Sequence, residues 1–337
     1  MSSRVTWSAP SNIAFIKYWG TKDTERVLPY HASISMSLEV CRSTTTVEVA
    51  PGLAEDEIWW LENGRRTLAT GTFRAKAAKH LDTLRRELGR TERLRVATSN
   101  SFPSSAGLAS SASGFATLAV AVSRAFGLTL EPGPLSVLAR LSGSGSAARS
   151  VLGGYVEWPA GPRASDGWIA PLATAEDWPL ANVIAILETG AKEVSSLDGH
   201  RRAPTSPYFE HRRSLVPERL ATVRRAIAAR DFDALATMLE LDAIDLHVIA
   251  MTSVPPIFYW NPATLAVLEA VRHLRRDGVP AAATMDAGAN VHVLCPAAAA
   301  DTVAARLVAV PGVRELIRDH VGSGPRPEDL DLLETPT

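Results

Sequence analysis

The chain has little of three things that often reveal function: cysteine, net charge and long apolar runs. Its 337 residues include only Cys41 and Cys295, too few for a disulfide framework or a cysteine metal site, which suits a reducing compartment. The formal net charge of −1 gives no overall attraction to nucleic acid or to an anionic membrane. An anionic ligand would therefore need a local pocket with its own charged residues.

The sequence also shows no sign of a targeting segment. Residues Met1–Trp7 lack the apolar core of a signal peptide, and no run of about 18 or more apolar residues occurs. We expect a cytoplasmic protein with neither a membrane nor a nucleic acid as partner. A composition of 46% hydrophobic and 21% charged residues can bury a large core, and the length suggests two domains.

Three common functional motifs are absent as well. No Gly-Lys-Ser/Thr tripeptide closes a Walker A loop, and the dinucleotide pattern G-x-G-x-x-G fails because Gly143 and Gly145 are followed by Ser146, Ala147 and Ala148. The G-x-S-x-G spacing of a nucleophile elbow fails around Ser144. These absences exclude the two common nucleotide folds and disfavour a serine hydrolase.

Hydrophobic periodicity predicts an α+β protein. Strands are expected at Thr44–Val49, Leu94–Thr98, Tyr155–Trp158, Val183–Leu187 and Val291–Cys295. Helices are expected at Arg74–Leu88, Gly114–Phe126, Glu131–Leu141, Pro217–Ala229, Phe232–His247, Pro262–Arg276 and Ala297–Val308. A Pro- and Gly-rich stretch at 159–179 predicts domains at residues 1–180 and 181–325, and the Pro-, Asp- and Glu-rich tail after Gly322 predicts a frayed end.

The most informative stretch runs from Ser101 to Gly114, where small residues lead directly into an apolar helix pattern. Small side chains let backbone N–H groups approach an anion, and the start of the following helix favours negative charge. Serine hydroxyls add donors or bind a magnesium ion that bridges phosphates. The residues expected in this phosphate cradle are Ser104, Ser105, Gly107, Ser110 and Ser111. A plain glycine–serine connector before a core helix is the alternative.

Three further segments accompany this loop in a fixed order: Ala9–Gly20, Gly143–Ser150 and Met285–Asn290. Together the four resemble the mevalonate diphosphate decarboxylase family, within the superfamily of galactokinase and homoserine, mevalonate and phosphomevalonate kinases. The resemblance implies a two-domain fold, in which a ribosomal-protein-S5-like N-terminal domain carries the phosphate loop. A ferredoxin-like C-terminal domain would follow, with the active site in the cleft between the domains.

The resemblance implies a two-stage reaction. ATP phosphorylates the C3 hydroxyl of a 5-phosphorylated mevalonate, and phosphate and CO2 then leave to form an alkene. A tertiary alcohol is a poor nucleophile, so a carboxylate is needed to orient it and accept its proton, and Asp286 is the candidate. An aspartate that forms a turn or caps a helix is the alternative interpretation.

Two basic residues and an asparagine complete the expected catalytic set. Arg149 fits the task of holding the departing carboxylate in a plane with two parallel hydrogen bonds. Lys17 lies in an apolar stretch, where an unpaired ammonium would be costly, so it should meet a carboxylate or phosphate. The resemblance implies that Lys17 polarises the C3 oxygen and that Asn12 hydrogen-bonds the substrate carboxylate. A surface arginine and a snorkelling lysine are the alternatives.

The resemblance also implies ATP and Mg2+ as cofactors, a phosphorylated mevalonate as substrate and a homodimer. Ser110 and Ser111 would position the transferred phosphate, with Ser111 as the metal ligand. The 5-phosphate would lie between Tyr18 and Ser146. The expected substrate-binding residues are Tyr18, Ser144, Ser146, Ser195 and Ser196.

Two positions depart from the family pattern. Thr21 stands where diphosphate-using members have a lysine after Tyr-Trp-Gly, and Leu197 replaces the arginine of their Ser-Ser-Arg segment. Each lost cationic contact is worth about 1.5–3 kcal/mol, so we expect mevalonate 5-phosphate as substrate and isopentenyl phosphate as product. The alternative is mevalonate 5-diphosphate, giving isopentenyl diphosphate. Cations that would restore diphosphate binding are Lys22, Lys192, His200, Arg201 and Arg202.

Two histidines and two other classes of function stay open. His31 and His200 stand where the diphosphate enzymes have other residues, and each either shapes the phosphate pocket or is an ordinary loop residue. The competing classes are a mevalonate-type kinase without decarboxylation and a catalytically silent binding protein. Retention of every charged candidate residue argues against both, and release of CO2 would exclude the kinase.

Overall fold

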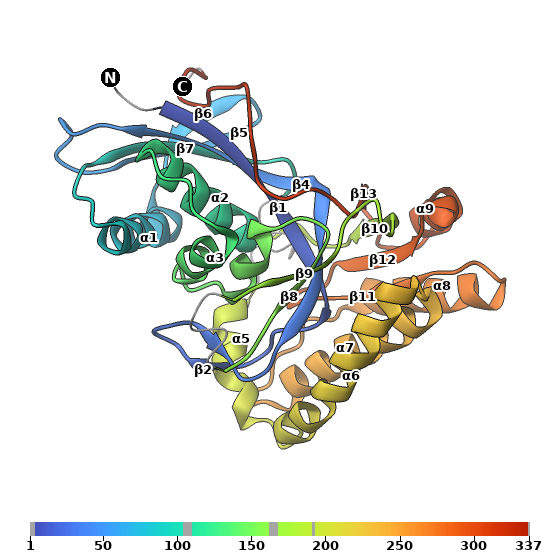
Figure 1. The fold of residues 1–337 in the computed structure, drawn as a ribbon. Coiled ribbons are helices and arrows are strands. Elements are labelled where there is room, and N and C mark those ends of the chain that lie inside the picture. Colours follow the sequence, from blue (N-terminus) through green and yellow to red (C-terminus); the bar gives the residue numbers. More distant parts are fainter. Residues whose placement is uncertain (1–3, 104–109, 162–167, 191–192, 336–337) are drawn as a thin grey trace.

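The computed structural model describes residues 4–103, 110–161, 168–190 and 193–335, which form two main β-sheets with helices packed against them (Figure 1). The first sheet has the order β14-β1-β4-β7-β5-β6, and β8 pairs with β4 and β9. The second has the order β11-β12-β10-β13, and β2 and β3 form a small hairpin. The α+β architecture expected from the sequence is confirmed.

The strands of the first sheet are β1 Arg4–Ile16, β4 Ser33–Val49, β5 Glu57–Glu62, β6 Arg65–Leu68, β7 Leu94–Asn100, β8 Tyr155–Trp158, β9 Ala170–Ala173 and β14 Arg326–Pro327. Those of the second are β10 Leu180–Ile186, β11 Ala282–Thr284, β12 Val291–Pro296 and β13 Glu315–His320, and the hairpin is β2 Thr21–Asp23 with β3 Leu28–Pro29. The helices are α1 Gly71–Leu88, α2 Ser110–Ala125, α3 Pro132–Arg140, α5 Ser196–Arg202, α6 Phe209–Ala229, α7 Phe232–Thr252, α8 Pro262–Arg276 and α9 Ala300–Val308, with 3-10 turns η1 Gly145–Val151, η2 Ala203–Thr205 and η3 Ala297–Ala299.

The long strand β1 is the main element that the sequence did not predict. It pairs antiparallel with β4, and the register shifts between Pro10, opposite Arg42, and Asn12, opposite Ser37. Proline has no N–H to donate, and it stands where the ladder is interrupted. Nearly every residue of β1 is buried, so the alternation that reveals a half-exposed strand is missing from its sequence.

The predicted helices agree with the structure where capping signals are clear. For α8 the predicted bounds are confirmed, because Asn261 and Thr264 form a capping box and Pro262 occupies the first turn. For α6 the predicted start at Pro217 is wrong, since the helix begins eight residues earlier at Phe209 and continues through the proline. Burial of Phe209 and Val216 against the core outweighs the hydrogen bond that proline cannot make.

The expectation of a frayed C-terminal tail is also wrong. Residues 321–333, here called the C-terminal strap, run back along the first sheet, where β14 pairs with Trp7 and Ser8 of β1. Leu332 and Leu333 are buried at the strap's end. The acidic residues that suggested disorder instead form ion pairs, Glu328 with Arg326 and Asp331 with Arg4, and the prolines favour the strap's extended course.

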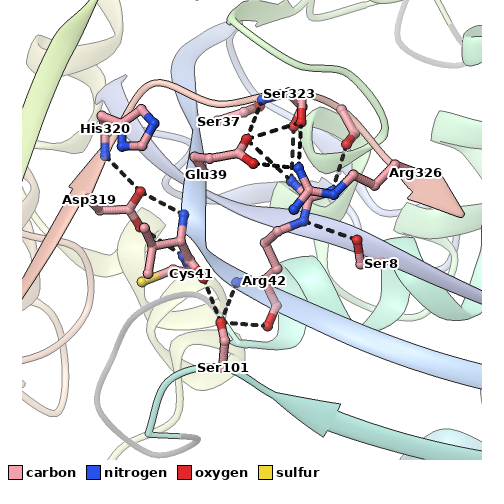
Figure 2. A network of polar contacts seen from close by, with 12 residues as sticks. Ser8, Ser37, Glu39, Cys41, Arg42, Ser101, Asp319, His320, Ser323 and Arg326 are labelled. Atoms are coloured by element: carbon pink, nitrogen blue, oxygen red, sulfur yellow. Dashed lines mark hydrogen bonds and ion pairs between the residues drawn. The ribbon is translucent and has the colours of Figure 1, made fainter. Parts of the chain in front are cut away.

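A polar network fixes the strap to the interrupted stretch of β4 (Figure 2). Arg42 donates to the carbonyl oxygens of Ser323 at 3.2 Å and Gly324 at 2.7 Å, and the Arg326 guanidinium pairs with Glu39. Asp319 of β13 accepts hydrogen bonds from the backbone N–H groups of Val40 and Cys41. The network thus joins the two sheets where the β1–β4 register breaks.

The interior consists of packed apolar clusters, and β1 contributes residues to two of them. One lies between the first sheet and helices α1 to α3, and another between the second sheet and helices α8 and α9. A central cluster combines Ile13 and Phe15 of β1 with Ile184 of β10, Val216 of α6 and Leu239 of α7. Figure 1 shows β1 running from the first sheet down to the side of α6 and α7. The end of β1 is therefore held between the two halves of the fold.

Candidate active site

A cavity of about 540 Å3 lies where the end of β1 meets helices α1, α2, α5 and α7. The predicted site residues that line it are Lys17, Tyr18, Ser110, Ser111, Ser144, Ser146, Arg149, Ser195, Ser196 and Asp286. Asn12 is not part of the described lining. Ser104, Ser105 and Gly107 lie outside the residues that the structure describes. Residues from both ends of the chain thus converge on one cavity.

An ion pair between Lys17 and Asp286 occupies this cavity. Lys17 Nζ lies 2.8 Å from Asp286 Oδ1, and the lysine side chain is only 1% exposed. Burial lowers the pKa of Lys17 although the Asp286 charge opposes the shift. Burial would raise the pKa of Asp286, but the Lys17 charge and hydrogen bond outweigh it and hold that pKa below its usual range. Asp286 is therefore an ionised carboxylate, able to accept a proton.

The loop after β11 holds Asp286 in place. The Asp286 carbonyl accepts a hydrogen bond from the Gly288 N–H at 2.8 Å. Asn290, at the end of the loop, accepts hydrogen bonds from the N–H groups of Leu187 and Glu188 and donates to the Glu188 carbonyl. The loop is thus bound to the end of β10, and the small residues around Asp286 leave room for a ligand.

Arg149 is a buried cation whose hydrogen-bond partners are neutral. Its guanidinium donates to Ser35 Oγ at 2.9 Å, Ser33 Oγ at 2.6 Å and Asn12 Oδ1 at 3.2 Å. Burial lowers the pKa of Arg149 to about 10, so it stays charged at neutral pH. Within the described ranges no carboxylate forms an ion pair with it, and a buried charge without one favours an anionic ligand in the cavity.

Asn12 lies behind this arginine. Its amide donates to the Ser146 carbonyl at 3.2 Å and to Ser150 Oγ at 2.8 Å, while its oxygen accepts from Arg149. All of its amide groups therefore have protein partners. In this conformation Asn12 acts on the cavity through Arg149 and Ser146, and direct contact with a substrate carboxylate stays a prediction.

Tyr18 forms one wall together with aromatic neighbours. Its ring lies 5.2 Å from that of Trp158 and 4.1 Å from that of His200, and its hydroxyl hydrogen-bonds to Thr21 Oγ1. Burial raises the pKa of Tyr18 to about 12, so the phenol keeps its proton. A Cβ on Gly145 would lie 2.5 Å from the Tyr18 ring, which explains why glycine is needed beside it.

Helix α5 supplies a second wall. Ser195 caps it by accepting a hydrogen bond from the Asp198 N–H at 3.1 Å, and it donates to Asp198 Oδ2 at 2.6 Å. Leu197 and Arg201 line the cavity beside Ser196, and Arg201 lies 3.7 Å from the Asp198 carboxylate. The proposed serine ligand at 195 is thus already engaged in capping.

The two histidines have different places. His200 lines the cavity and accepts a hydrogen bond on Nδ1 from the Gly20 N–H at 3.0 Å. Burial lowers the pKa of His200 to about 3, so it is neutral and contributes no cation. His31 is not part of the described lining and instead contacts Arg212 of α6.

Two lysines of the lining were missed in the sequence. Lys76 and Lys79 of α1 reach the cavity near Ser110 and Phe115 of α2. Their spacing of three places them on one helix face. Because the chain has only five lysines, two on one face are the feature of the sequence that could have indicated an anion site. Of the cations suggested for a diphosphate, Arg201 lines the cavity, Lys22 and Arg202 are not part of the described lining, and Lys192 lies outside the described residues.

Two family models match most of the chain. One, described as the diphosphomevalonate decarboxylase-like N-terminal domain, matches residues 9–169. The other, the mevalonate 5-diphosphate decarboxylase C-terminal domain, matches residues 182–327.

The part of the chain that the structure describes holds no helix long and apolar enough to cross a membrane.

Similar proteins agree with these matches. A diphosphomevalonate decarboxylase from Ganoderma lucidum is 37% identical over 315 residues, which cover 87% of this chain and 78% of that protein. The crystal structure of mevalonate diphosphate decarboxylase from Staphylococcus aureus has a TM-score of 0.90 at 31% identity and covers 98% of this chain and 99% of that one. MDDEF in complex with MVAPP, AMPPCP and magnesium has a TM-score of 0.88 at 34% identity, over 98% of this chain and 100% of that chain.

Proposed function

Since the chain belongs to the diphosphomevalonate decarboxylase family, we propose that it is an ATP-dependent decarboxylase of a 5-phosphorylated mevalonate. The observation that carries this proposal is the Lys17–Asp286 ion pair, which shares a cavity with the charged Arg149. A proton acceptor and a carboxylate-binding cation are the two protein groups that the reaction requires. Confirmation of the family also supports the roles assigned from the motifs.

Asp286 acts on the C3 hydroxyl. Its ionised carboxylate accepts the hydroxyl proton while the oxygen attacks the terminal phosphate of the nucleotide. Lys17, fixed against Oδ1, keeps the carboxylate charged and stabilises negative charge on the attacking oxygen. Lys17 is buried and Asp286 is half-buried at the cavity wall, so the charge of Lys17 is only partly screened from the reacting atoms.

Arg149 acts in the elimination. Its guanidinium binds the substrate carboxylate, and Ser33, Ser35 and Asn12 keep its plane fixed. When the C3–O bond breaks, phosphate leaves with that electron pair, and the electrons of the bond to CO2 form the alkene.

The nucleotide side of the cavity suits a magnesium-bound triphosphate. Among the described residues no group of three His, Cys, Asp or Glu side chains could hold a metal ion, which fits a magnesium ion bound mainly by phosphates. Ser110 and Ser111 would hold it, with Ser111 as ligand, and it would neutralise charge on the transferred phosphate. Lys76 and Lys79 supply further positive charge to the nucleotide.

We infer that the phosphorylated substrate is mevalonate 5-diphosphate. The relatives named for this substrate cover most of the chain, and MDDEF is described with MVAPP. Arg201 offers a cation beside Leu197, where the family's arginine is lost. The monophosphate is the second candidate, because Thr21 and Leu197 line the cavity as neutral residues and His200 is uncharged.

The division of the chain near residue 180 is part of the same proposal. It is supported by the change of sheet at this point, because β9 belongs to the first sheet and β10 to the second. The strap is an exception, since it returns to the first sheet. We propose that residues 1–180 form the nucleotide-binding domain and that residues 181–325 form the domain that carries Asp286. A homodimer and a cytoplasmic location stay predictions.

The test is release of CO2 and ADP by the purified protein with ATP and magnesium. Mevalonate 5-phosphate and mevalonate 5-diphosphate are offered in parallel at equal concentrations. A higher kcat/KM for the diphosphate is expected, and preference for the monophosphate would establish the second candidate. ADP without CO2 from either compound would identify a kinase and overturn decarboxylation.

A further inference from the structure

A cluster of charged side chains from α6 and α7, with Asp242 and Arg212 buried at its centre, lies next to the Lys17–Asp286 pair. Asp242 of α7 is fully buried and accepts hydrogen bonds from Arg212 at 2.9 and 3.1 Å and from Arg219 at 3.1 Å. Arg219 also pairs with Asp245 at 2.7 Å. None of these side chains belongs to the described lining of the cavity.

The cluster holds the backbone of Lys17 from both sides. The Lys17 N–H donates to Asp242 Oδ2 at 2.6 Å, and Arg212 Nη2 donates to the Lys17 carbonyl at 2.9 Å. Ile16, one residue earlier, is the last residue of β1 paired with β4. Buried backbone groups need partners, and at Lys17 a carboxylate and a guanidinium take the place of the neighbouring strand.

His31 extends this arrangement to a second segment of the chain. Its Nδ1 lies 3.0 Å from the Ala32 carbonyl, and its Nε2 lies 2.8 Å from Arg212 Nη1. A carbonyl and a guanidinium have fixed roles as acceptor and donor, so the ring is neutral, with its proton on Nδ1 and an acceptor at Nε2. Burial lowers the pKa of His31 to about 4, which agrees with this tautomer. His31 therefore supports Arg212.

Stability alone gives a weak reason for such a cluster. Replacement of a buried ion pair by apolar side chains of similar volume is often neutral or stabilising. Here the charged groups make directed hydrogen bonds to the backbone N–H and carbonyl of Lys17. In addition, α7 packs against β1, which precedes Lys17, and against β11, which precedes Asp286. The same helix thus supports both members of the catalytic ion pair.

We propose that Asp242 and Arg212 are positioning residues, which clamp the backbone N–H and carbonyl of Lys17 and so fix the place where its ammonium meets Asp286. This inference rests on the proposed function, in which Lys17 acts beside the reacting oxygen. Asp242 and Arg212 would influence the turnover step more than the binding of either substrate.

The test compares two arginines that bind the same carboxylate. Arg212→Lys keeps the charge but lacks the planar fork that reaches both Asp242 and the Lys17 carbonyl. We expect kcat to fall about 30-fold, with KM for both substrates within about twofold, because a small misplacement of a reacting group costs much rate. The distance from Lys17 Nζ to Asp286 Oδ1, now 2.8 Å, should increase in the crystal structure of the variant.

Arg219→Gln is the matched control, since Arg219 binds Asp242 without touching Lys17. Its kcat should stay within about threefold of the wild type even where its melting temperature falls as far as that of Arg212→Lys. The proposal is overturned if Arg212→Lys keeps full kcat, or if both variants lose kcat in proportion to their loss of stability.

Two further measurements cover the remaining outcomes. If Arg212→Lys does not fold, His31→Gln is assayed instead, where a fall of about tenfold in kcat is expected and a kcat within about threefold of the wild type overturns the proposal. If the wild type releases no CO2 from either substrate, the proposed function fails. The Lys17–Asp286 distance in the crystal structures of Arg212→Lys and Arg219→Gln then decides the positioning role, which an unchanged distance overturns.

Discussion

The cavity is lined by two groups of residues that are held in different ways. The charged group, Lys17, Arg149 and Asp286, is anchored by hydrogen bonds to side chains or backbone groups far away in the sequence. The α5 group, Leu197, His200 and Arg201, lies within one short helix. The ion pair that Arg201 forms with Asp198 is 3.7 Å long, and its two side chains are 59% and 48% exposed.

This difference separates chemistry from substrate choice. An exposed ion pair within one helix contributes little to stability, so Arg201 and the exposed Leu197 can be exchanged at low cost to the fold. The charged group cannot be altered without leaving a buried charge or a buried hydrogen-bonding group without a partner. Substitutions in the two groups should therefore affect different kinetic quantities.

The largest effect is expected for Asp286→Asn in the charged group. The amide is nearly isosteric but cannot accept the C3 proton, so kcat should fall about 1000-fold. Dissociation constants for nucleotide and substrate, measured by calorimetry, are the control and should change little. Near-normal turnover would remove Asp286 from its role as proton acceptor.

Arg149→Lys should have the next largest effect. A lysine keeps the charge but loses the planar set of donors to Ser33, Ser35 and Asn12, so kcat/KM should fall about 100-fold. Arg140→Lys, another buried arginine outside the described lining, is the control for a general loss of stability. Equal losses in both variants would show that Arg149 acts only in packing.

Thr21→Lys combined with Leu197→Arg tests the α5 side of the comparison. Two added cations should raise the ratio of kcat/KM for the diphosphate to that for the monophosphate at least about tenfold, while kcat changes little. Leu68→Arg, which adds charge at an exposed leucine on β6, is the control. An unchanged ratio would mean that the distal phosphate is bound by other residues.

The smallest effect is expected for His200→Asn. With a pKa of about 3, His200 is neutral throughout the range from about pH 5 to 8, so its titration cannot shape the activity profile there. An asparagine oxygen can still accept the Gly20 N–H hydrogen bond. We expect kcat/KM within about threefold and an unchanged profile, whereas loss of an inflection near pH 6 would show a charged histidine.

The fold could be predicted from the sequence where a local signal decides the structure. The proline and asparagine at the start of α8 set its first turn, and the prediction agrees with the structure. β1 could not be predicted, because its residues are buried by elements distant in the sequence. The composition of the strap suggests disorder. Its ordered course could not be predicted, because its partners Arg42 and Thr46 lie almost three hundred residues earlier.

The candidate site shows the same division. Lys17, Arg149 and Asp286 stand in recognisable motifs, and the structure brings all three to one cavity. Lys76 and Lys79 have no motif, only a helical spacing that many surface lysines share. The role that we propose for Asp242 and Arg212 rests on their hydrogen bonds to Lys17, about two hundred residues away in the sequence. Hydrophobic periodicity cannot predict such long-range contacts.

The C-terminal strap has a consequence for synthesis of the chain. A ribosome releases β1 well before β14, so the first sheet keeps an open edge at Trp7 and Ser8 until residues 326–327 have emerged. During that interval Arg42 lacks the strap carbonyls that accept its hydrogen bonds. Nascent chains that stall before the strap would thus be prone to edge-to-edge aggregation, even though their catalytic residues have all been made.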